Sequence, residues 1–224
     1  DTNLATSLGF PNPENIVPIS EMKELIAERT GSSPGKSETY FRLNPKVDDL
    51  PEKYWQKMDS IKLMVMGQVI RGGGGCYCPE NVLLRALVNH LLLARNEVVI
   101  MDMAAGIEHL GRATASAVDK LIVVVEPGRR SLETARTIKK LAEDIGVKNI
   151  AVVGNKIRSP SDKEFLTASL PGFEFIRFIP FDQAIIEADQ ASVPLVRASK
   201  LVSNEVANIY SKLVPATQHQ NTLR

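Results

Sequence analysis

From residue 61 onwards, short apolar runs alternate with longer segments of helical periodicity. Such alternation is typical of βαβ units, and strands that are apolar on both faces belong to a parallel sheet covered by helices. The sequence therefore predicts an α/β fold with a mostly parallel β-sheet that helices flank on both faces. The expected strands are 61–66, 97–101, 121–125, 149–153 and 173–179, and the expected helices are 79–94, 107–117, 131–145, 182–190 and 195–213, with a further helix that Ser161 and Glu164 cap.

The first sixty residues carry a weaker pattern. A helix is expected over residues 2–9, and a second one starts from a cap at Ser20 and stops at Gly31. Residues 32–57 are polar and punctuated by proline, so we expect a less regular excursion there. The polar tail 215–224 is expected to be frayed.

Charge excludes several classes of partner. Lysine plus arginine number 27 and aspartate plus glutamate 26, so the chain has no basic excess that would attract nucleic acid or an acidic membrane. No apolar run approaches the roughly 20 residues of a membrane span, and no signal peptide is recognisable. The sequence therefore predicts a cytoplasmic protein.

Polar residues follow several of the expected strands, and in parallel sheets ligands bind beyond the carboxyl ends of the strands. Asp102 comes at the end of one strand, and a run of small residues leads from it to Gly106. Such a pair is typical of a Mg²⁺ and γ-phosphate switch, although Asp102 is equally well placed to cap the next helix.

Two further strand ends carry candidate ligand-binding groups. Asn155 and Lys156 follow one strand, and the loop of Pro180, Phe181 and Asp182 follows the next. The asparagine amide can both donate to and accept from the edge of a base. The alternative for each segment is a plain turn or helix cap.

Both cysteines of the chain, Cys76 and Cys78, follow a run of four glycines. In an extended segment, residues two apart point the same way, so both sulfurs can bind one soft cation. A tetrahedral site needs about four ligands, which a two-fold dimer supplies when each subunit donates its pair. The alternatives are a redox dithiol or two buried cysteines without a chemical role.

Taken together, these segments resemble one known family. Arg71 to Asn81, Met101 to Arg112, Asn155-Lys156 and Ile179 to Asp182 resemble CooC-type accessory ATPases, which insert nickel into carbon monoxide dehydrogenase. That family belongs to the MinD/ParA branch of P-loop ATPases. The resemblance covers nearly the whole chain and implies one P-loop ATPase-like α/β domain over residues 1–224.

The resemblance also implies roles for the candidate residues. Cys76 and Cys78 would hold Ni²⁺ or Zn²⁺ at the interface of a homodimer whose client is carbon monoxide dehydrogenase. Asp102 and Gly106 would be the catalytic switch that binds Mg²⁺ and the γ-phosphate. ATP or ADP would be bound through its adenine by residues of the two strand-end segments, which are Asn155, Lys156, Pro180, Phe181 and Asp182. The function implied is that of an ATP-dependent metallochaperone, without a nucleic-acid or membrane partner.

One departure from the family is large. Its members open with a strand and a Lys-Gly-Gly-x-Gly-Lys-Thr loop, the deviant Walker A sequence, and residues 1–224 contain no such loop. Gly31 to Ser37 does not replace it, because three residues and not four separate its glycines. We therefore expect an N-terminally truncated chain that is inactive alone as an ATPase.

Two other functions are alternatives. A MinD/ParA-type partitioning or positioning ATPase would bind DNA or membrane, which the near-neutral charge and the cysteine pair disfavour. An electron carrier like the nitrogenase iron protein would hold an iron–sulfur cluster, but its ligands come from separate segments and not from one Cys-x-Cys. Visible absorption distinguishes the two kinds of metal site, because a cluster is brown.

Overall fold

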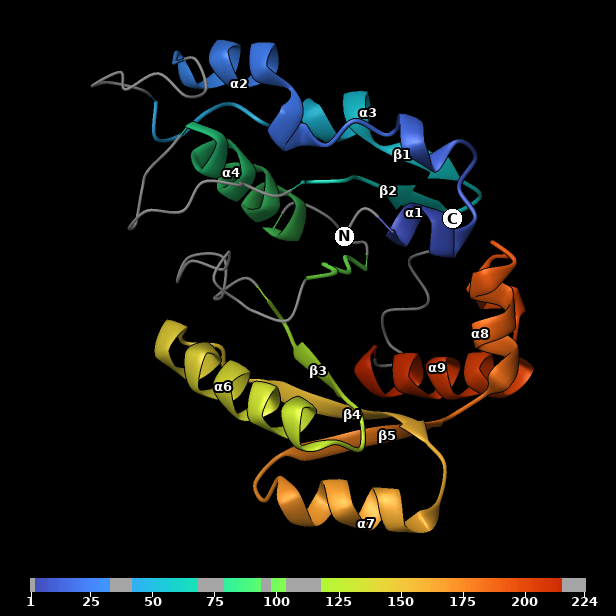
Figure 1. Cartoon of the computed structure of the whole chain (residues 1–224). Helices are drawn as coiled ribbons and strands as arrows, with labels where there is room; N and C mark the ends of the chain where they lie inside the picture. The colour runs from blue at the N-terminus through green and yellow to red at the C-terminus, as the bar shows by residue number, and fades with distance from the viewer. Residues whose placement is uncertain (1–2, 33–41, 68–78, 94–97, 104–117, 215–224) are drawn as a thin grey trace. The chain divides into compact units, whose positions relative to one another are not determined.

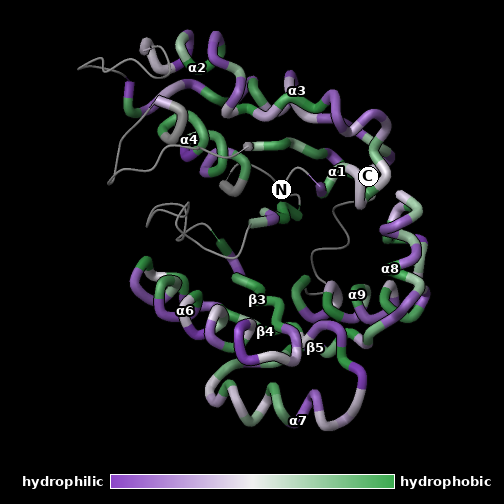
Figure 2. Tube along the Cα trace, in the orientation of Figure 1, coloured by the Kyte–Doolittle hydropathy of each residue, from purple (hydrophilic) through white to green (hydrophobic). Residues whose placement is uncertain are grey.

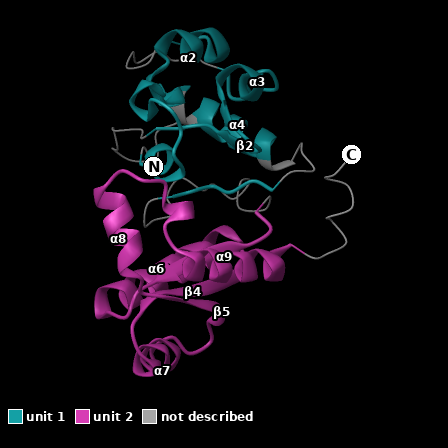
Figure 3. Ribbon diagram, turned by 90° about the vertical axis from the view of Figure 1, so that its right-hand side faces the viewer, with its two compact units in different colours: residues 1–104 teal, residues 105–224 magenta. Residues whose placement is uncertain are grey.

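The computed structural model describes residues 3–32, 42–67, 79–93, 98–103 and 118–214. Two compact units comprise Asp1–Ala104 and Ala105–Arg224, coloured teal and magenta in Figure 3. Cys76, Cys78, Gly106, the expected helix 107–117 and the expected frayed tail 215–224 lie outside the described residues. One domain over residues 1–224 stays a prediction.

The first unit is mainly helical. Its described elements are α1 (Leu4–Leu8), η1 (Pro13–Asn15), η2 (Ile19–Glu21), α2 (Lys23–Thr30), α3 (Leu50–Tyr54), β1 (Gln56–Met58), β2 (Ile61–Leu63) and α4 (Pro79–Leu93) (Figure 1). Its largest core cluster joins α2, α3 and α4 through Ile26, Leu50, Leu83 and Leu87, all buried. The expected helix 79–94 is thereby confirmed, and so are the stops at Gly9 and Gly31, both left-handed glycines.

In the first unit, the expected excursion 32–57 contains the short helix α3 and the start of β1, and a less regular structure there stays a prediction. One expectation is wrong, because the run 61–66 forms a strand only over Ile61–Leu63. This strand pairs antiparallel with β1, from Gln56 opposite Leu63 to Met58 opposite Ile61. Asp59, with φ of 51°, starts the two-residue turn between them, and such a turn favours a hairpin over a long crossover.

The expected strand 97–101 is also not seen. Residues 98–103 belong to no strand, and Val98 and Ile100 are exposed at 57% and 84%. Among the described residues this segment pairs with no neighbouring strand, and an apolar run cannot bury its side chains as a strand without one.

The second unit contains the parallel sheet. Its described elements are β3 (Leu121–Val125), α6 (Arg129–Ile145), β4 (Ile150–Ile157), α7 (Pro160–Ser169), β5 (Glu174–Pro180), α8 (Gln183–Gln190), η3 (Leu195–Arg197) and α9 (Lys200–Leu213). The strand order is β3-β4-β5, and both pairs are parallel. The α/β class and the last three expected strands are confirmed.

Helices cover both faces of this sheet. Ala151, Val153 and Ile176 form a core cluster with Ile209 and Leu213 of α9. On the other face, α7 packs against β4, and α7 and α9 lie on opposite sides of the strands in Figure 1. Polar and apolar residues alternate along α6 in Figure 2, as expected for a helix with one buried face.

The register between β4 and β5 has two irregularities. They lie between Val152 and Val153, where β5 carries an extra residue, and between Gly154 and Ile157, where β4 does. A bulge of this kind bends a strand and redirects side chains. The second bulge lies at the carboxyl end of β4, where the sequence predicted the base-binding residues.

Two helix caps and the start of one helix differ from those predicted. Ser20 lies in η2, and Met22 precedes α2. The capping box of α7 uses Ser159 with Asp162 and not Ser161 with Glu164, because Pro160 occupies the first helical position. The expected helix 195–213 is divided into η3 and α9, and Ser199 caps the latter.

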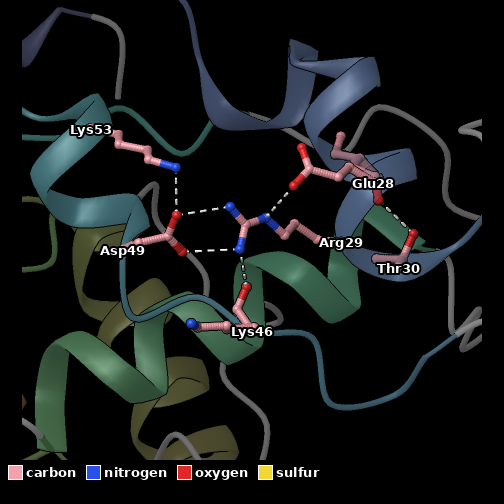
Figure 4. Close-up of polar contacts among 7 residues, drawn as sticks. Glu28, Arg29, Thr30, Lys46, Asp49 and Lys53 are labelled. Atoms are coloured by element: carbon pink, nitrogen blue, oxygen red, sulfur yellow. Dashed lines mark hydrogen bonds and ion pairs between the residues drawn. The ribbon is translucent and has the colours of Figure 1, made fainter.

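A bidentate ion pair fixes α2 to the start of α3 (Figure 4). Arg29 donates to both carboxylate oxygens of Asp49, at 3.0 and 2.8 Å, and Lys53 Nζ lies 2.7 Å from Oδ2. These bonds hold the pKa of Asp49 well below its usual range, and the bonds from Arg29 have the largest effect.

Because the pKa of Asp49 is lowered in the folded state, its contribution to stability is present at neutral pH. That contribution begins to fall once the pH is below the unfolded value of about 3.9, and it is lost as the pH falls further through the lower pKa of the folded state. Asp49→Asn should therefore be less stable than the wild type at pH 7, and the difference should shrink towards pH 3. Urea unfolding followed by circular dichroism at several pH values measures this. Asp48→Asn, in an exposed ion pair with Lys46 at 3.6 Å, is the control, and a pH-independent deficit of Asp49→Asn would contradict the argument.

Candidate functional site

Three loops of the second unit leave the same edge of the parallel sheet. They follow the carboxyl ends of β3, β4 and β5, and they start at Glu126, Arg158 and Phe181. Backbone pairing continues past the last strand end, because the Phe181 N–H donates to the Ile157 carbonyl oxygen at 2.9 Å. The structure therefore brings the two expected base-binding segments, 155–156 and 180–182, together at this edge.

Lys156 adopts a strained conformation at the bulge in β4. Its φ of +55° lies in the left-handed region, which costs a residue with a side chain about 1–2 kcal/mol. An ion pair at 2.7 Å joins its Nζ to Glu126 Oε1, at the end of β3. The side chain of Lys156 thus connects the ends of two neighbouring strands, a role that the sequence did not predict.

Asn155 lies beside Lys156 in the same bulge and is partly buried. Its side-chain amide makes no hydrogen bond to another described residue. A partly buried amide at a strand end can both donate to and accept from a ligand. The position fits the edge of a base, and base binding by Asn155 stays a prediction.

Asp182 caps α8 and contacts the start of α9. Its Oδ1 accepts from the Ala184 N–H at 3.0 Å, and its Oδ2 accepts from the Ser199 hydroxyl at 2.5 Å. The Ser199 bond, followed by the Ala184 bond, lowers the pKa of Asp182. Ser199 is buried and accepts in turn from the Val202 N–H at 3.1 Å. Asp182 therefore holds the loop together, and Ser199 is a site residue that the sequence reasoning missed, although its cap position before α9 was a usable signal.

Arg158 is the second residue that was missed. Its guanidinium carbon lies 3.8 Å from the centre of the Phe181 ring, so the ends of β4 and β5 are joined by a cation–π contact. No local sequence pattern marks this pair, because the contact depends on the register of β4 with β5.

The expected metal and phosphate residues stay predictions. Asp102 is exposed and belongs to the first unit, while Gly106, Cys76 and Cys78 lie outside the described residues. In the described ranges, histidine, cysteine, aspartate and glutamate form no group of three or more that could hold a metal ion. No helix in that part of the chain is long and apolar enough to cross a membrane.

The edge carries groups that suit a planar polar ligand. It offers an amide with both hydrogen-bonding functions, an aromatic ring and a guanidinium, on a rigid frame of strand ends and helix caps. These are groups that hold the base of a nucleotide.

Comparison with known proteins identifies relatives over most of the chain. An uncharacterized ATP-binding protein of Methanocaldococcus jannaschii is 44% identical over 217 residues, which cover 96% of this chain and 84% of the relative. The carbon monoxide dehydrogenase accessory protein CooC of Rhodospirillum rubrum is 48% identical over 195 residues, which cover 86% of this chain and 74% of the relative. A second uncharacterized ATP-binding protein of M. jannaschii is 33% identical over 224 residues, which cover 96% of this chain and 83% of the relative.

No protein-family model matches the chain. Each of the three relatives is nevertheless more than 30% identical to this chain over most of both sequences. One of them is an accessory protein by name. The chain belongs to the family of the carbon monoxide dehydrogenase accessory protein CooC and its ATP-binding relatives.

Proposed function

We propose that the protein binds ATP, with the adenine base at the carboxyl edge of β4 and β5. The observation that carries this is the bulge at the end of β4, which contains Asn155 and is followed by the pairing of Ile157 with Pro180. The Asn155 amide makes no hydrogen bond to another described residue. The family supports the choice of nucleotide, because two relatives are ATP-binding proteins by name. Lys156, Pro180, Phe181 and Asp182 would line or position the same site.

The proposed activity is that of an ATP-dependent metallochaperone for carbon monoxide dehydrogenase, acting in the cytoplasm. The client follows from the relative named as its accessory protein. Cys76 and Cys78 of two subunits would hold Ni²⁺ or Zn²⁺ between them, so that nucleotide and metal occupy one homodimer. Asp102 and Gly106 would bind Mg²⁺ and the γ-phosphate during hydrolysis.

Hydrolysis also needs a phosphate-binding loop. Residues 1–224 contain no Lys-Gly-Gly-x-Gly-Lys-Thr sequence. We therefore propose that these residues hold the base but do not turn over ATP efficiently by themselves. Equilibrium binding, and not turnover, is the appropriate test of the site on this chain.

Asn155→Ala should weaken ATP binding by roughly 5- to 20-fold, the cost of about one to two hydrogen bonds left unmade. It should also reduce the preference for ATP over GTP, because the lost amide distinguishes an amino group from a carbonyl on the base. Isothermal titration with both nucleotides measures the two effects.

The matched control is Asn204→Ala, which removes an exposed amide from α9. Unchanged affinity and unchanged preference in Asn155→Ala would contradict the proposed base site. Failure of the wild-type chain to bind any adenine nucleotide would contradict the proposed function itself.

A further inference from the structure

The backbone of Arg158 is fixed by the capping box of α7. Asp162 Oδ2 accepts from the N–H groups of Arg158 and Ser159, at 2.7 and 3.1 Å. In turn, the Ser159 hydroxyl oxygen accepts a hydrogen bond from the Asp162 N–H at 3.4 Å. The start of the Arg158 side chain is therefore held by a helix terminus and not by a free loop.

The backbone of Phe181 is fixed from the other strand. Its N–H donates to Ile157, and the following residue, Asp182, is anchored by Ala184 and Ser199. The ring and the guanidinium thus approach each other from two constrained backbones. Less conformational entropy is lost on ligand binding when both groups are already in place.

The guanidinium of Arg158 differs in its bonding from those of Arg136 and Arg177. Arg136 donates to the Ser169 carbonyl oxygen at 2.7 Å, and Arg177 pairs with Glu205 at 3.6 Å. Arg158 makes neither a salt bridge nor a side-chain hydrogen bond to any other residue that the structure describes. Its contact is the Phe181 ring, and the residue is exposed.

A cation–π contact that only stabilises the Phe181 ring does not require an arginine. Lysine serves at comparable contacts in this unit, where Lys139 Nζ lies 4.5 Å from the Phe173 ring and Lys163 Nζ 5.8 Å from Phe178. Only a planar guanidinium offers a second flat face once the first is occupied. That second face is suited to an aromatic ligand, since bases stack on arginine planes as well as on aromatic rings.

We propose that Arg158 is the base-stacking residue of the site, with its guanidinium held between the Phe181 ring and a purine base. This inference rests on the proposed function and adds to it the residue that contacts the face of the base. Asn155 would read the edge of the same base. Five N–H donors remain in the guanidinium plane for the ribose or a phosphate.

The test compares Arg158→Lys, Arg158→Ala and Phe181→Leu with the wild type, using ATP and the base-free compound ribose 5′-triphosphate. Arg158→Ala should weaken ATP binding about tenfold, as expected for the loss of one base stack. Arg158→Lys should restore less than half of the lost binding free energy, because the ammonium keeps the charge but not the plane. Affinity for the base-free compound should change much less.

Two further measurements separate stacking from a structural role. In NMR spectra, the Nε–H resonance of Arg158, assigned by its absence in Arg158→Lys, should shift on addition of ADP through the ring current of the base. Lys148→Ala, a loss of one exposed positive charge at the amino edge of the sheet, is the control for net charge and should bind ATP normally.

The outcomes are distinguishable. Wild-type affinity for ATP in both Arg158 variants, or an unmoved Nε–H resonance at saturating ADP, would overturn the stacking role and leave the proposed function intact. Equal losses for ATP and for the base-free compound would also overturn it, because a base contact cannot produce them. Absence of ATP binding by the wild type would remove the proposed function and this inference together.

Discussion

Replacing Cys76 or Cys78 with serine is expected to reduce metal binding from about one Ni²⁺ or Zn²⁺ per dimer to none. The chain has two cysteines in all, so a tetrahedral thiolate site needs both of them from each of two subunits. One substitution removes two of the four sulfurs at once, because the dimer repeats it. A serine hydroxyl does not replace a thiolate as ligand for a soft cation.

Metal content and molecular mass measure this effect together. Equilibrium dialysis followed by elemental analysis gives the stoichiometry, and light scattering with and without metal gives the oligomeric state. Tyr77→Phe is the matched control, because it changes the residue between the two cysteines and keeps both thiols. Stoichiometric binding that survives in both serine variants would exclude the site, and one metal per monomer in the wild type would exclude its symmetric form.

Gly154→Ala should destabilise the second unit strongly. A Cβ at this position would lie 2.4 Å from Phe178 Cδ1, 2.9 Å from Cε1 and 3.2 Å from Leu166 Cδ1. Gly154 is buried between β5 and α7, so neither neighbour can move away without disturbing the core. Overpacking of this kind costs about 1–3 kcal/mol in the free energy of unfolding.

Denaturant unfolding of Gly154→Ala and Gly128→Ala provides the comparison. Gly128 precedes α6, and a Cβ there would meet nothing within 4 Å. The Gly128 variant should lose at most about 1 kcal/mol, because Gly128 is the N-cap of α6 and alanine is a poorer cap, but no core side chain has to move. Adding Phe178→Leu to Gly154→Ala should recover part of the loss. Equal stability of the two glycine variants would show that Phe178 and Leu166 relax freely.

The sequence predicted the sheet of the second unit well, because burial on a parallel sheet leaves long apolar runs that polar residues interrupt only at the strand ends. Leu121–Val125 is such a run, and its strand has the predicted bounds. β4 was predicted to end at Val153 and continues to Ile157. The polar pair Asn155-Lys156 looked like a loop, and only pairing with β5 shows that it is a bulge within the strand.

In the first unit the pattern was less informative. β1 consists of Gln56, Lys57 and Met58, which carry no alternation of apolar and polar residues. Its strand state comes from pairing with β2, and such tertiary context overrides weak local preference. The apolar residues of β2 suggested a buried parallel strand, but so short an apolar run does not by itself determine the kind of element.

At the candidate site, strand-end position alone was enough to predict that Asn155 and Asp182 lie at the carboxyl edge of the sheet. It was not enough for Arg158 and Ser199, whose partners are 17 or more residues away along the chain. Pro160 did contain the missing information about the α7 cap, because a proline in the first helical position assigns the cap to the residue before it, Ser159.

The two irregularities between β4 and β5 compensate each other. Ala151 pairs with a residue 23 positions later, Gly154 with one 24 positions later, and Ile157 again with one 23 positions later. Deleting either extra residue alone would displace the Arg158 loop relative to the Phe181 loop by about 3.3 Å along the strands. Deleting both would leave the two loops facing each other as they do now. Natural insertions and deletions in these strands should therefore occur as pairs wherever the edge of the sheet keeps its function.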